Sequence, residues 1–168
     1  MVLNLLLGQT LEFTGDPFLQ PWQEVTQHRE DGAVLVENGH IRAVGTCTVL
    51  ATEYPQAKIF DYGKDLIIPG FVDAHVHYPQ TAIIASWGKR LIDWLNTYTF
   101  PEEMRLSDPD YATKIAEEYL DIALSHGTTT MASYCTSAPT SVTSYFEAAS
   151  KRGMRVVGLS LIHISEPT

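Results

Sequence analysis

The chain has 168 residues, of which 45% are hydrophobic and 18% charged, proportions typical of a globular protein that buries a core. Its formal net charge of −9 argues against a nucleic-acid partner, because such binding depends on clustered Lys and Arg. No apolar run approaches the roughly 20 residues of a spanning helix, so we expect no membrane partner and a soluble, cytoplasmic protein.

Residues 1–64 consist of short apolar runs separated by turn residues, which predicts a small β-rich module. Met1 to Leu7 is interpreted as a strand. Residues 34–37 and 40–44 flank Asn38-Gly39, a pair that favours the positive φ angles of a type I′ hairpin turn. The polar segment 14–32 is expected to be a long loop.

From residue 65 the pattern changes to strands alternating with amphipathic helices, which predicts parallel βαβ units and an α/β fold. A complete (β/α)₈ barrel takes about 250 residues, so at most three of its eight strands fit here. The predicted elements are strands at 71–78, 128–135 and from 154, and helices at 108–125, with Ser107 as N-cap, and at 140–151.

The most informative string is Pro69-Gly-Phe-Val-Asp-Ala-His-Val-His77. Alternate side chains of a strand share a face, so Asp73, His75 and His77 point the same way. Two neutral imidazoles on one face can converge on a metal ion, whereas the alternative is two packed histidines with accidental spacing. The Pro-Gly pair, the acid two residues upstream and the Gly-Thr-Thr-Thr string from residue 127 favour a metal site.

This string resembles the first-strand signature of the amidohydrolase superfamily, whose members pair a small β-sandwich with a metal-bearing (β/α)₈ barrel. Tyr78-Pro79-Gln80 and residues 91–101 resemble the guanine deaminases in particular. The resemblance implies a β-sandwich module at 1–64 and the first βα units of a truncated barrel at 65–159. Residues 160–168 resemble translated adaptor sequence and are expected to be a non-native tail; the alternative is a true alternative terminus.

The resemblance implies hydrolysis of guanine to xanthine and ammonia. His75 and His77 would be zinc ligands, and His77, Tyr78, Pro79 and Gln80 would line the purine pocket. Zinc would lower the pKa of bound water to about 7, and a carboxylate would carry the proton to the leaving ammonia. The resemblance also implies a homodimer for the full-length family form.

The family pattern takes its other zinc ligands, a histidine and an aspartate, and its proton-carrying glutamate from later barrel strands. We therefore expect an N-terminal fragment that contains no catalytic residue and is inactive alone. Two functional alternatives stay open. One is an amidohydrolase acting on a different cyclic amidine or a chlorinated heterocycle. The other is a non-catalytic truncated isoform that acts as a binding partner.

Other candidate residues have two interpretations each. Asp73 either orients a metal ligand or holds a nearby backbone group. Trp87, Trp94, Tyr98 and Phe100 either cover a flat purine or belong to a packed helix. We expect His126 to cap a helix C-terminus and His40 to be solvated. Neither a disulfide framework nor a cysteine zinc site is predicted from Cys47 and Cys135, and a buried structural thiol is the expected role of Cys135.

Overall fold

The computed structural model of the chain describes residues 2–160, so 161–168 of the expected tail lie outside the described residues. The chain divides into two compact units, Met1–Pro69 and Gly70–Thr168. Among the described residues, no helix combines the length and the apolar character that crossing a membrane requires.

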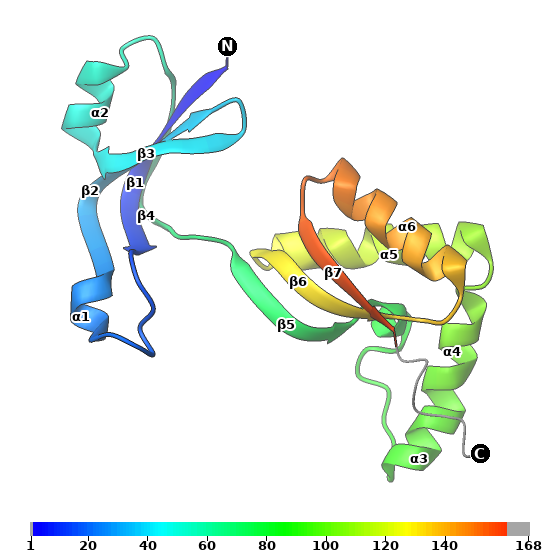
Figure 1. Ribbon diagram of the computed structural model, residues 1–168. Helices are drawn as coiled ribbons and strands as arrows, with labels where there is room; N and C mark the ends of the chain where they lie inside the picture. The colour runs from blue at the N-terminus through cyan, green and yellow to red at the C-terminus, as the bar shows by residue number, and fades with distance from the viewer. Residues whose placement is uncertain (1, 161–168) are drawn as a thin grey trace. The chain divides into compact units, whose positions relative to one another are not determined.

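The first unit is built on one four-stranded sheet of order β3-β2-β1-β4 (Figure 1). β1 pairs antiparallel with β2 and parallel with β4. Leu5 and Leu35 face each other across β1 and β2 and are fully buried beneath Leu50 of helix α2. The elements are β1 (Leu3–Phe13), α1 (Trp22–Val25), β2 (Thr26–Glu37), β3 (His40–Thr46), α2 (Cys47–Glu53) and β4 (Lys58–Ile67).

The predicted hairpin is confirmed, because Asn38 and Gly39 join β2 to β3 with φ angles of 50° and 84°. The loop predicted at 14–32 is wrong in its second half, since β2 begins at Thr26. This part of β2 pairs with β1 through polar side chains: Arg29 forms an ion pair with Glu12 at 2.5 Å. Because these pairs replace apolar burial, the strand shows no hydrophobic alternation.

The second unit contains a parallel sheet of order β5-β6-β7, in which each strand is followed or preceded by a helix (Figure 1). This confirms the predicted parallel βαβ order. Its core is formed by α5, α6 and the sheet, with Leu120, Met131 and Tyr145 almost fully buried. The main elements are β5 (Phe71–His77), α5 (Pro109–Ser125), β6 (Thr128–Cys135), α6 (Pro139–Lys151) and β7 (Arg155–Ser160).

The N-cap of α5 differs from the prediction. Asp108, not Ser107, accepts hydrogen bonds from the backbone nitrogens of Asp110 and Tyr111, while Ser107 donates its hydroxyl back to the Met104 carbonyl. Pro109 at the first helical position places the cap on the residue just before it. At the other end, a ring nitrogen of His126 lies 2.8 Å from the Ile122 carbonyl oxygen, which confirms its predicted capping position.

Four short helical segments connect β5 to α5. They are η1 (Tyr78–Ile83), α3 (Leu91–Trp94), η2 (Leu95–Thr99) and α4 (Phe100–Arg105). The first is a 3-10 helix, and η2 is a π-helical turn between the two α-helical pieces. The helical interpretation of the aromatic-rich stretch is therefore confirmed. This connection lies next to the end of β5 and supplies most of the neighbouring pocket.

Candidate metal and ligand site at the end of strand β5

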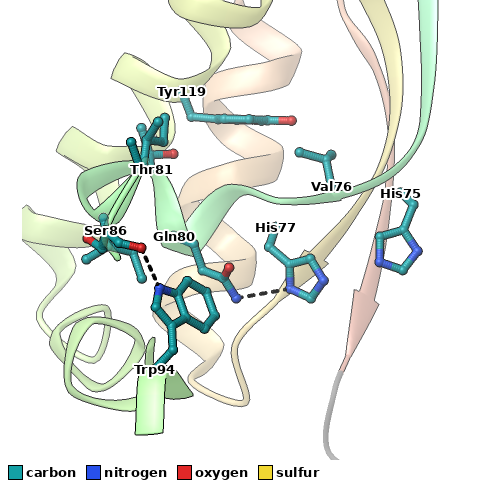
Figure 2. A pocket seen from close by; sticks show the side chains of 11 residues that line it. His75, Val76, His77, Gln80, Thr81, Ser86, Trp94 and Tyr119 are labelled. Carbon is teal, nitrogen blue, oxygen red and sulfur yellow. Dashed lines mark hydrogen bonds between the residues drawn. The ribbon is translucent and has the colours of Figure 1, made fainter. Parts of the chain in front are cut away.

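A pocket with a cavity volume of about 430 Å³ opens at the C-terminal end of β5 (Figure 2). The strand contributes both histidines of the His-x-His motif, and the connection to α5 contributes most of the other wall. The lining residues are His75, Val76, His77, Gln80, Thr81, Ile83, Ile84, Ala85, Ser86, Trp94 and Tyr119.

The two imidazoles lie close together, with ring centroids 5.4 Å apart and planes tilted by 47°. His75 is exposed and His77 is half-buried. Burial lowers the pKa of His77, a charged His75 would lower it further, and Glu103 opposes both effects. A lowered pKa favours the neutral imidazole, which is the form that binds zinc.

The donor set fits part of a zinc site. Two neutral imidazoles on one strand face supply nitrogen ligands of the kind zinc prefers, whereas a catalytic zinc usually has three protein ligands. Within residues 2–160, no group of three or more His, Cys, Asp or Glu is placed to hold a metal ion. The described residues therefore offer two ligands and leave the others to be supplied elsewhere.

Asp73 accepts a hydrogen bond of 3.1 Å from the backbone nitrogen of His75. This contact corresponds to the second interpretation of Asp73, in which its carboxylate holds a neighbouring backbone group. The contact restrains the backbone at His75 and, through it, the direction of the imidazole.

Tyr134, which no sequence motif indicated, packs against both histidines. Its ring stacks on His77 with centroids 4.7 Å apart, and lies 4.9 Å from the ring of His75. Tyr134 is the partner of His77 in the parallel pairing of β5 and β6. No spacing within either strand reveals that register, so this contact could not be predicted from either segment alone.

Gln80 connects His77 to α4. Its side-chain nitrogen donates a hydrogen bond of 3.1 Å to the Glu103 carboxylate. The same nitrogen lies 3.3 Å from Nδ1 of His77 (Figure 2). The 3-10 helix explains why Gln80 lies beside His77, because residues three apart lie on the same side of such a helix. Glu103 follows the resemblance stretch at 91–101 and was also missed.

Tyr78 and Pro79 do not line the pocket, because both side chains are buried in the packed interior. The Tyr78 hydroxyl donates to the Ser141 carbonyl at 2.6 Å, and its ring stacks on Tyr145 with centroids 4.7 Å apart. Burial raises the pKa of the Tyr78 hydroxyl well above its ordinary value. Of the four residues predicted to line a purine pocket, the structure brings His77 and Gln80 together there.

Of the four aromatic residues considered as a cover, only Trp94 lines the pocket. Its indole nitrogen donates to the Ser86 carbonyl at 3.0 Å, which fixes the ring against the opposite side of the connection (Figure 2). Trp87 is 76% exposed. Trp94 thus agrees with both predicted alternatives, because it ends helix α3 and also forms a wall of the pocket.

The chain is similar to proteins of known families. The sequence model of the Amidohydrolase family matches residues 66–164. The guanine deaminase of Escherichia coli strain K12 is 39% identical over 129 residues, covering 76% of this chain and 29% of that protein. A probable guanine deaminase of Deinococcus radiodurans is 38% identical over 160 residues, covering 92% of this chain and 36% of that protein.

Among solved structures, the guanine deaminase of Bradyrhizobium japonicum superposes with a TM-score of 0.87 and 32% identity, over 94% of this chain and 35% of that one. The chain thus spans about a third of the length of these relatives.

Proposed function

Because the chain belongs to the amidohydrolase family, we propose that it forms the first part of a zinc-dependent site that hydrolyses guanine to xanthine and ammonia. The observation that carries the proposal is the pocket at the end of β5, where His75, His77 and Gln80 face one cavity. The pocket lies within the region that the family model matches, and the similarity to guanine deaminases favours guanine over other cyclic amidines or chlorinated heterocycles.

The pocket residues have two proposed roles, metal binding and purine binding. His75 and His77 hold the zinc ion, and His77 and Gln80 border the purine. The 3-10 turn that begins with Tyr78 and Pro79 brings Gln80 back beside His77. The roles of Tyr78 and Pro79 are thus indirect, because their buried side chains anchor this turn.

The chemistry divides between the metal and the chain. When bound, zinc supplies Lewis acidity that activates water near neutral pH. Gln80 binds the polar edge of the purine through its amide, and Trp94 supplies an apolar wall that limits access of other water molecules. A carboxylate must carry a proton to the leaving ammonia. The family pattern takes that carboxylate, with the remaining ligands, from later strands.

We propose that residues 1–64 contribute to a β-sandwich and 65–159 form the first units of a (β/α)₈ barrel, with support from the fold match. Because the described residues supply two imidazoles where catalytic zinc usually has three protein ligands, we propose that the 168-residue segment alone does not deaminate guanine.

Location and assembly are also proposed. Cys47 and Cys135 are free thiols, which suits a reducing compartment such as the cytoplasm. We propose that the full-length protein is a homodimer with guanine as its small-molecule partner. Gel filtration with light scattering measures that assembly, and a monomeric mass would contradict the dimer.

The test uses the protein as its gene encodes it, with whatever sequence flanks residues 1–168. We expect it to contain zinc and to release ammonia from guanine, and we expect His75→Ala and His77→Ala to lose both properties. His40→Ala is the matched control, because His40 is an exposed histidine in the first unit. Zinc retention and full activity in both pocket variants would contradict the assignment.

A further inference from the structure

The side-chain amide of Gln80 is held by a carboxylate from another element. Gln80 belongs to η1, and its Nε2 donates a hydrogen bond of 3.1 Å to Oε1 of Glu103 on α4, 23 residues later in the chain. A carboxylate accepts hydrogen bonds and donates none, so it must face the NH₂ end of the amide. This contact therefore determines which end of the Gln80 amide remains for a ligand.

The remaining end is the carbonyl oxygen. Nε2 is held by the Glu103 carboxylate, and Oε1 has no hydrogen-bond partner within residues 2–160. An amide oxygen accepts hydrogen bonds from N–H groups, which a purine base carries on its ring and on its exocyclic amine. If the amide turned over, its NH₂ would face those N–H groups, donor against donor.

Glu103 differs from the glutamate beside it. Glu102 is buried and bonds to Arg105 at 2.8 Å and to the Tyr111 hydroxyl, contacts that stabilise the junction of α4 and α5. Among the described residues, no Lys or Arg lies within ion-pair distance of Glu103. The Glu103 carboxylate accepts its hydrogen bond from Gln80. It therefore contacts a residue of the pocket wall, whereas Glu102 stabilises the helix junction.

We propose that Glu103 is a positioning residue for purine recognition. Its carboxylate holds the Gln80 amide so that the carbonyl oxygen is presented to the N–H groups of the bound base. The inference rests on the proposed function, because it concerns how the same pocket selects its substrate. It predicts that the contribution of Glu103 depends on the presence of Gln80.

A double-mutant cycle tests this dependence in the zinc-loaded protein. KM, kcat and zinc content are measured for Gln80→Ala, Glu103→Ala and the double variant. Glu103→Gln is a milder second variant, because its side chain keeps an oxygen that can accept from Gln80. The matched control is Glu118→Ala, since Glu118 is an exposed glutamate on α5 that pairs with Lys114 and does not line the pocket.

We expect Glu103→Ala to raise KM for guanine about tenfold, the effect of losing one well-placed hydrogen bond, with kcat within about twofold and zinc content unchanged. In the Gln80→Ala background the same change should alter KM by less than about twofold. Glu103→Gln should raise KM about threefold, again only when Gln80 is present, and it decides the matter if Glu103→Ala does not fold. Glu118→Ala should leave KM unchanged.

The contradicting results are separate from failure of the proposed function. If Glu103 variants raise KM equally in both backgrounds, leave KM unchanged, or lower kcat or zinc content, Glu103 does not act through Gln80 and the inference is wrong. If the wild-type protein does not deaminate guanine, the proposed function fails and this inference fails with it. If wild type is active and the cycle shows no coupling, only this inference fails.

Discussion

Replacing Tyr78 by Phe should measure how firmly the end of β5 is attached to α6. The Tyr78 side chain is fully buried, and its hydroxyl donates to the Ser141 carbonyl at 2.6 Å and accepts a hydrogen bond from the Ser141 hydroxyl at 2.5 Å. Each such bond contributes about 1 kcal/mol net. The Ser141 hydroxyl keeps its bond from the Thr136 nitrogen, so the expected total cost of Tyr78→Phe is about 2 kcal/mol.

Tyr119→Phe is the matched control, because its ring lies in the same tyrosine cluster but its hydroxyl donates to the sulfur of Met131. A thioether is a weak acceptor, so the control should cost about 0.5 kcal/mol or less. Urea unfolding of the three proteins gives the free energies of unfolding. If Tyr78→Phe costs no more than Tyr119→Phe, the bond to Ser141 does not stabilise this end of the strand.

Three further predictions concern stability. Gly32→Ala should destabilise by about 2 kcal/mol because the added Cβ would clash with the side chain of the buried Thr10. Adding Thr10→Ala to this variant should recover part of the cost, and an unchanged free energy of unfolding for Gly32→Ala would refute the clash. Thr99→Val should stabilise the protein by about 1 kcal/mol, because the buried Thr99 hydroxyl has no hydrogen-bond partner within residues 2–160. The control Thr113→Val removes a hydrogen bond to Ser144 and should not stabilise. Equal changes in the free energy of unfolding for the two variants would refute the prediction. Burial raises the pKa of the Cys135 thiol to about 11, above the unfolded value of about 8.5. Its contribution to stability is therefore complete below about pH 8.5 and is lost as the pH rises toward 11; urea unfolding from pH 8 to 10.5 should show a decline that Cys135→Ala reduces, and identical pH profiles would contradict it.

Parts of the fold with a local signal were predictable. Asn38-Gly39 identified the hairpin, and the apolar stripe before Gly127 identified α5, because turn chemistry and helical periodicity are read within one segment. The first half of β2 was missed because Arg29 and its neighbours pair with polar residues of β1. Such pairing depends on a partner strand that lies elsewhere in the sequence.

In the candidate site, too, residues with a local sequence signal were predicted and residues placed by long-range contacts were missed. His75 and His77 were found from the two-residue period of one strand, and Gln80 from the motif that follows. Tyr134 contacts the two histidines because of the strand register, and Glu103 contacts Gln80 because of the path of the β5 to α5 connection. Neither is set by local spacing. Conversely, Tyr78 is adjacent to the motif but points into the core, so adjacency in sequence did not predict its place.

The most direct test of the proposed function is conversion of guanine to xanthine by the purified full-length protein, before and after removal of bound metal. The pocket predicts that a chelator abolishes conversion, that added zinc restores it, and that His77→Ala cannot be restored. Conversion that survives complete removal of metal, or a zinc-loaded protein that leaves guanine unchanged, would contradict it.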